Sequence, residues 1–165
     1  MVNRTREAHG FELAELNIAR LLEPLDSPRL AGFVAGLEPV NAAADAAPGF
    51  VWRLKDESTA DATSFRIFED DWLLVNMSVW TTHEALHAFV YDELHRAVLR
   101  QRRDWFEHLA EAVTVLWWVP AGSRPTVAEA QERLEHLRKH GTTPYAFGLR
   151  DTVAPPAPGA DYAPQ

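Results

Sequence analysis

Several features are missing from this sequence of 165 residues, and each absence excludes a class of protein. There is no cysteine, which excludes disulfide bonds, thiolate metal sites and cysteine nucleophiles. No apolar run approaches the roughly 20 residues of a membrane span, and residues 1–10 lack the apolar core of a signal peptide. Positive charge is scarce, because 16 Lys and Arg stand against 24 Asp and Glu. We therefore expect a cytoplasmic protein whose partners are neither nucleic acids nor membranes.

The composition is that of a folded protein. Hydrophobic residues make up 47% of the chain and charged residues 24%, and a chain of this length forms one domain with a substantial core. We place that domain at residues 10–150. Residues 1–9 and the Pro/Ala-rich residues 151–165 are expected to be disordered tails, because they contain too little apolar surface to offset the entropy of ordering.

Alternation and helical periodicity predict the order β-α-β-β-β-α-β-α. Strands are expected at residues 11–19, 50–54, 64–68, 72–80 and 113–119. Helices are expected to begin after Asp26 or Ser27, with a kink at Pro39, and after the capping-box residues Thr81 and Thr126. The second of these is expected to break at Asp92 or Glu93 and to resume until about residue 110.

This order predicts an α+β fold, a ferredoxin-like antiparallel sheet with helices on one face and an extra C-terminal helix. The other face of such a sheet would be a large bare apolar surface, which normally binds a partner. We therefore expect a homodimer with the two sheets packed back to back, which is a dimeric α/β barrel.

Two polar residues lie on the apolar side of the helix that follows Asp92. Helical-wheel geometry places His95 and Arg102 beside Leu99 and Phe106. In one interpretation Arg102 binds a carboxylate or backbone carbonyls, because an unpaired buried charge is costly, and His95 is a satisfied core histidine. In the other, both face a pocket, where His95 is an acid/base and Arg102 binds a substrate anion or enolate.

The strands provide further polar groups. Glu15 and Asn17 share one strand face, and Asn76, Ser78 and Trp80 share another. If these faces converge, a cavity with an aromatic wall is lined by Asn17, Arg53, Asn76 and Trp80. The alternative is that Glu15 simply pairs with Arg53.

Residues His83 to His87 match the H-E-x-x-H pattern of zinc proteases, and Glu107 could be a third ligand. Glu84 has a simpler role as the capping-box partner of Thr81, and no downstream metal motif follows. We assign no metal site.

Several strings resemble an uncharacterised bacterial family of the dimeric α/β-barrel superfamily, which includes antibiotic-biosynthesis monooxygenases and haem-degrading monooxygenases. Between Phe11 and about Leu149 the strings are Leu13-Ala-Glu-Leu-Asn17, Pro48-Gly-Phe-Val-Trp-Arg53, Val75-Asn-Met-Ser-Val-Trp80, Arg102-Arg-Asp-Trp-Phe106, Leu116-Trp-Trp-Val-Pro120 and Gly141-Thr-Thr-Pro. Thr142 departs from the proline expected at that position.

The resemblance implies a pocket lined by an Asn of the first strand and a His of the second helix, here Asn17 and His95. It implies a protein that binds an apolar or aromatic metabolite and catalyses a cofactor-independent monooxygenation or a related reaction. The catalytic residues would be His95, Arg102 and Asn17, and the substrate-binding residues would be Arg53, Asn76, Trp80 and Trp105. Two alternatives stay open: haem binding with His95 as axial ligand, and a non-enzymatic binding or assembly module.

Overall fold

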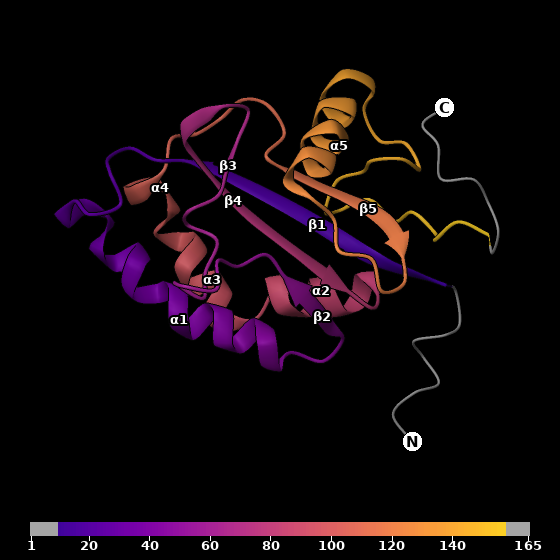
Figure 1. The fold of residues 1–165 in the computed structure, drawn as a ribbon, viewed down its shortest axis with the longest axis horizontal. Helices are drawn as coiled ribbons and strands as arrows, with labels where there is room; N and C mark the ends of the chain where they lie inside the picture. Colours follow the sequence, from indigo (N-terminus) through magenta and orange to yellow (C-terminus); the bar gives the residue numbers. More distant parts are fainter. Residues whose placement is uncertain (1–9, 158–165) are drawn as a thin grey trace.

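The computed structural model describes residues 10–157, which form five strands and five α-helices (Figure 1). The elements in chain order are β1 (Phe11–Arg20), a 3-10 helix (Pro28–Leu30), α1 (Ala31–Ala46), β2 (Phe50–Arg53), β3 (Arg66–Ile67), β4 (Asp70–Trp80), α2 (His83–Val90), α3 (Glu93–Arg100), α4 (Arg102–Trp105), β5 (Thr114–Pro120) and α5 (Val127–His140).

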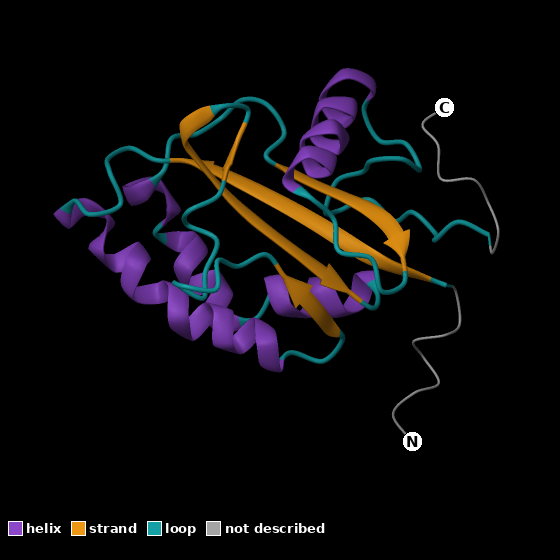
Figure 2. Cartoon of the chain, viewed as in Figure 1, coloured by secondary structure: helices purple, strands orange, loops and turns teal. Residues whose placement is uncertain are grey.

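The strands form one antiparallel sheet in the order β2-β4-β1-β5, and β3 pairs with β4. The long strands β1 and β4 lie side by side at its centre (Figure 2), and their register places Leu16 opposite Met77. The predicted α+β fold with an antiparallel sheet is confirmed. Of the predicted strands, only 64–68 is much shorter in the structure, where it is reduced to β3.

The helices cover both faces of the sheet, so the prediction of a bare second face is wrong. Helix α5 lies apart from α1–α4 (Figure 1) and packs Ala130 and Leu134 on the face of the sheet that carries Leu16, Met77 and Trp117. None of these five residues exposes any surface. The homodimer stays a prediction, but the bare apolar face from which it was argued does not exist.

Local sequence explains where α5 begins and ends. The Thr126 hydroxyl accepts a hydrogen bond from the backbone N–H of Glu129, which caps the first turn as predicted. The helix ends at Gly141, whose φ of 72° is accessible to glycine at little cost. Position 142, the departure from the family pattern, lies directly after this end.

The helices on the other face differ in detail from their predicted bounds. Helix α2 is capped by Thr82, not Thr81, and the predicted break is confirmed because Asp92 caps α3. The chain leaves the helix at Trp105, well before residue 110. Ser27 makes no side-chain capping bond, and α1 continues through Pro39 to Ala46.

The C-terminal part of the described chain is attached to the domain. The Asp151 carboxylate accepts hydrogen bonds from Thr142 and from the backbone N–H of Gly148, and the Val153 carbonyl accepts one from the Trp118 indole. Contact therefore continues to residue 153, beyond the expected boundary at 150. The predicted tail at 1–9 and the rest of the predicted tail, 158–165, lie outside the described residues.

Within residues 10–157, no helix has both the length and the apolar character that crossing a membrane requires.

Candidate functional site

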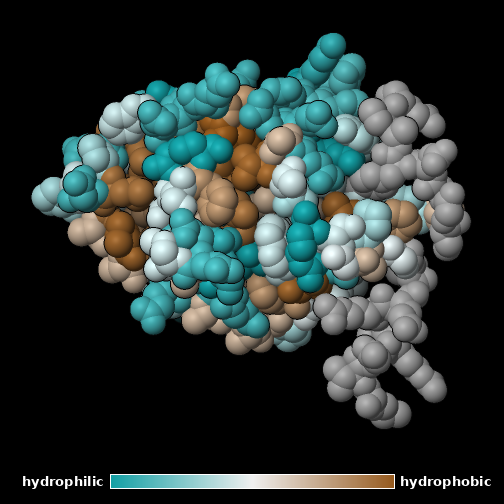
Figure 3. Space-filling model, viewed as in Figure 1, coloured by the Kyte–Doolittle hydropathy of each residue, from teal (hydrophilic) through white to brown (hydrophobic). Residues whose placement is uncertain are grey.

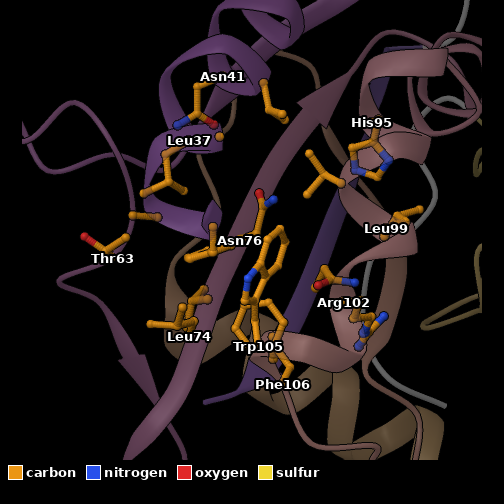
Figure 4. Close-up of a pocket in the computed structure, with 18 of the residues that line it drawn as sticks. Leu37, Asn41, Thr63, Leu74, Asn76, His95, Leu99, Arg102, Trp105 and Phe106 are labelled. Atoms are coloured by element: carbon orange, nitrogen blue, oxygen red, sulfur yellow. The ribbon is translucent and has the colours of Figure 1, made fainter. Parts of the chain in front are cut away.

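A hollow lies between the sheet and the helices α1, α3 and α4 (Figure 4). It consists of two adjoining cavities of about 160 Å³ and 210 Å³. For comparison, an apolar protein cavity of about 150 Å³ binds benzene. Eight residues line both cavities: Asn17, Val40, Asn41, Arg53, Asn76, His95, Leu99 and Arg102. We call these two joined cavities the helix-side hollow.

The hollow exists because α1 and α3 bury few side chains against the sheet, whereas α4 packs its Trp105 against Leu74 of β4. Helix α3 has no buried residue, although it is strongly amphipathic, and its Leu99 is 42% exposed. In α1 only Ala44 is buried, while Phe33 and Leu37 are half-buried. On the face in Figure 3, hydrophobic surface is visible at the end of the molecule where α1 and α4 lie. Apolar side chains thus line the space instead of filling it.

Two rows of polar side chains form the floor of the hollow. In the first, Asn17 of β1 lies opposite Asn76 of β4 and Thr114 of β5, and its Nδ2 donates to the Thr114 Oγ1 at 2.9 Å. In the second, Glu15 lies opposite Ser78. Asn76 is exposed although it lies in the middle of a central strand, because the hollow is directly above it (Figure 4).

The carboxyl group of Glu15 has an unusual environment. Its Oε2 accepts a hydrogen bond from the Ser78 hydroxyl at 3.1 Å, and that hydroxyl accepts one from the Trp80 indole at 2.9 Å. Burial raises the pKa of Glu15 to about 7, although the Ser78 bond acts in the opposite direction. A carboxyl group with this pKa can both accept and donate a proton near neutral pH.

His95 is half-buried on the helix side of the hollow. Its Nδ1 donates to the carbonyl of Val90 at 3.1 Å, and its ring packs against Phe89 with 5.2 Å between centroids. Desolvation by burial lowers the pKa of His95, which favours the neutral ring. Because a carbonyl can only accept, Nδ1 carries the proton of the neutral ring and Nε2 is left as an acceptor.

Arg102 is a half-buried cation that has no partner in the part of the chain that the structure describes. It lines both cavities, and within residues 10–157 its guanidinium makes neither a hydrogen bond nor an ion pair. The interpretation in which a carboxylate or carbonyl satisfies Arg102 is therefore wrong. Figure 4 shows Arg102 on the same side of the hollow as His95 and Leu99. A cation in this position is available to an anionic group of a ligand.

Arg53 also lines the hollow, but the protein already occupies its guanidinium. Its Nε donates to the Asp45 carboxylate at 2.8 Å and its Nη1 to the Ala60 carbonyl at 2.7 Å. The alternative in which Arg53 pairs with Glu15 across strands of one chain is therefore wrong. Arg53 instead connects β2 to α1 and to the loop that follows β2.

The two tryptophans predicted to shape the wall lie at different parts of the hollow. Trp80 lines the cavity that contains Glu15 and stacks on Phe89 at 5.2 Å. Trp105 lines the more apolar cavity and packs on Phe33 at 5.6 Å. The seven predicted site residues therefore all line the hollow, and five of them, excluding Trp80 and Trp105, line both cavities.

Sequence reasoning did not choose Glu15, Ser78, Asn41 or Thr114 as site residues. Strand alternation placed Glu15 beside Asn17, and this was a usable signal because a carboxylate on a central strand needs a solvated or polar surrounding. No comparable signal marks Asn41 or Thr114 in the sequence, because they reach the hollow only through the packing of α1 and the register of β5.

The H-E-x-x-H histidines have a structural contact. His83 Nε2 and His87 Nε2 both donate to the carbonyl of Leu149, at 3.0 and 2.7 Å, and Leu149 lines the cavity that contains Glu15. In the part of the chain that the structure describes, no group of three or more His, Asp or Glu side chains could hold a metal ion.

Several solved structures resemble this fold at low identity. SnoaB from Streptomyces nogalater, a cofactor-independent oxygenase, is 18% identical over 70% of this chain and 95% of its own, with a TM-score of 0.44. Rv0793 from Mycobacterium tuberculosis is 10% identical over 70% and 99%, with a TM-score of 0.46. NE2512 from Nitrosomonas europaea, a protein of unknown function, is 13% identical over 72% and 97%, with a TM-score of 0.44. Such likeness does not extend to activity.

Among curated proteins none matches the chain. A family model does match, over residues 12–161, and this range includes every element that forms the hollow. The expectation of an uncharacterised family is thereby confirmed: the chain belongs to the family described as a domain of unknown function, DUF3291.

Proposed function

We propose that the helix-side hollow binds a small, largely apolar or aromatic molecule that carries an acidic or carbonyl oxygen. The observation that carries this proposal is Arg102, a half-buried cation with no partner in the described chain, in a hollow with apolar walls. Binding sites for small molecules typically combine apolar walls with a few polar groups that fix orientation. Asn17 and Asn76 provide such groups opposite α3.

The reaction that fits these residues best is proton transfer. His95 would accept a proton at Nε2, while Arg102 and Asn17 would stabilise the developing oxyanion of the substrate. The finer form of the proposal is a cofactor-independent monooxygenase, in which dioxygen is the co-reactant that attacks the deprotonated substrate. An assembly module would have a filled, dry interior, so the open hollow favours a ligand-binding protein over that alternative.

Binding is tested with 3-nitrophenol, which carries an acidic oxygen, and with its methyl ether 3-nitroanisole, by the quenching of tryptophan fluorescence, since Trp105 and Trp80 line the hollow. We expect saturable binding by the wild type. The blocking variant is Gly36→Leu, because Gly36 lines the hollow and its added side chain would occupy it. The control is Ala35→Leu, one residue earlier on α1 and exposed. Equal binding by both variants, or no binding of either compound by the wild type, contradicts the proposal.

The roles of His95 and Arg102 are tested with the substitutions His95→Ala and Arg102→Ala. For each variant, the affinity for 3-nitrophenol and the free energy of unfolding are measured separately. We expect affinity to fall while stability changes little. Loss of stability with unchanged affinity would assign these residues a structural role only.

A further inference from the structure

Within residues 10–157, only one of the two carboxyl oxygens of Glu15, a residue of β1, is hydrogen-bonded. Oε2 is bound by the Ser78 hydroxyl, which is itself oriented by the Trp80 indole. Oε1 makes no hydrogen bond within residues 10–157, and Glu15 lines the cavity that also contains Ser78 and Trp80. Glu12, on the other face of the same strand, is different: it is 4% exposed, lines neither cavity and binds the Gly122 backbone N–H.

The same cavity contains groups that would stabilise an anion. Arg102 lines it with a guanidinium that has no partner among residues 10–157, and the amides of Asn17 and Asn76 lie in the row of floor residues next to Glu15. No basic side chain of the described chain forms an ion pair with Glu15, so its proton affinity is not reduced by a permanent partner. A proton acceptor and an unpartnered cation thus line one cavity without neutralising each other.

We propose that Glu15 is the general base of this site, that its substrates are planar weak acids of the phenol or enol class, and that Arg102 holds the resulting anion. This inference rests on the ligand binding of the proposed function, and it assigns to Glu15 the proton acceptance that was given there to His95. In the proposed step the O–H bond of the ligand breaks and the proton binds Glu15 Oε1. The electron pair stays on the ligand oxygen as a phenolate or enolate. The step needs no oxidant, and return of the proton to carbon would complete a tautomerisation.

The alternative proton acceptor is His95, and the pKa values of Glu15 and His95 are shifted in opposite directions. The raised pKa of Glu15, about 7, makes it a base only above neutral pH, whereas burial moves the pKa of His95 in the opposite direction. Ser78 is a positioning residue for Glu15. Because its hydrogen bond lowers the pKa of Glu15, removing the hydroxyl should raise that pKa further.

The test compares 3-nitrophenol with its methyl ether 3-nitroanisole, slightly above neutral pH, where 3-nitrophenol in water is mainly neutral. The nitrophenol absorbs visible light strongly only as the anion. For the wild type we expect the phenol to bind about tenfold more tightly than the ether, with the absorbance of the anion and without release of a proton to the buffer.

Glu15→Gln is expected to remove the preference for the phenol and the anion band while 3-nitroanisole still binds. Arg102→Gln should reduce both the preference for the phenol and the anion band. The control Arg103→Gln changes an exposed neighbour on α4 and should behave as the wild type. Should Glu15→Gln fail to fold, Ser78→Ala provides the second variant. It keeps the carboxylate, and the pH midpoint of the preference should move upward.

The outcomes separate the two proposals. Equal affinity for phenol and ether, with the phenol bound in its neutral form, overturns the role of Glu15 but leaves ligand binding intact. An anion band that persists in Glu15→Gln and disappears in His95→Gln assigns the base to His95 and also overturns the inference. If neither compound binds the wild type, the proposed function fails and the inference fails with it.

Discussion

The two faces of the sheet are made by the same strands but are covered differently. On the α5 face, Leu16, Met77, Trp117 and Leu134 expose no surface. On the opposite face, helix α3 has no buried residue and lies over a hollow. The chain therefore has enough apolar residues and helices to cover a sheet face with a close-packed core, and it does so on only one of the two faces.

This difference indicates that the open face does not result from a lack of apolar residues or of helices. Polar residues alternate with core residues along β1 and β4, so Glu15, Asn17 and Asn76 all point to the hollow while their neighbours point to the closed core. A buried carboxylate with a strongly raised pKa destabilises the ionised protein. Such a loss of stability is typical of residues that take part in binding or catalysis.

The largest expected effect comes from making a cavity in the closed face. Leu134→Ala should lower the free energy of unfolding by about 2 to 5 kcal/mol, because the close-packed surroundings cannot collapse onto the removed atoms. Leu99→Ala, on the 42% exposed residue of the hollow, should cost less than about 1 kcal/mol. Urea unfolding of both variants measures this difference, and equal losses would contradict the contrast between the faces.

The second effect is the pH dependence caused by Glu15. Its pKa is about 7 in the folded protein against an ordinary value of 4.5, so the unfolded state binds fewer protons between these values and stability falls as pH rises. Between pH 4.5 and values above 7, the wild type should lose about 3 kcal/mol of unfolding free energy relative to Glu15→Gln. Unfolding curves at several pH values measure this loss. A difference that does not vary with pH would show that Glu15 titrates normally.

Arg53 should have a smaller effect. Its guanidinium binds the Asp45 carboxylate and the Ala60 carbonyl, so Arg53→Gln should cost about 1 kcal/mol. A double-mutant cycle with Asp45→Asn measures the coupling. No coupling between the two residues would mean that Arg53, like Arg102, is free to serve a ligand.

The smallest effect on stability is expected for Arg102. Because its guanidinium has no partner in the described chain, Arg102→Gln should change the free energy of unfolding by less than about 0.5 kcal/mol. Thermal unfolding without ligand measures this change. A loss comparable to that of Arg53→Gln would reveal a structural contact and weaken the case for a ligand-binding cation.

The sequence predicted what depends on short-range patterns. Alternation placed Asn17 and Asn76 on polar strand faces, and the acidic cap at Asp92 marked the break before α3. It could not predict which face α5 covers, because both faces of the sheet present apolar residues to a helix. The sequence also could not predict that Arg102 has no partner in the described chain or that Arg53 contacts Asp45. Both features depend on how α1 and α3 are placed over the sheet.

The most direct test of the central claim, that the helix-side hollow is a ligand site, is a crystal structure of the protein soaked with 3-nitrophenol. We predict electron density for one ring between Asn76 and α3, with the phenolic oxygen near Glu15 and Arg102. A ring bound elsewhere, or a hollow filled by the side chains of α1 and α3, would contradict the account.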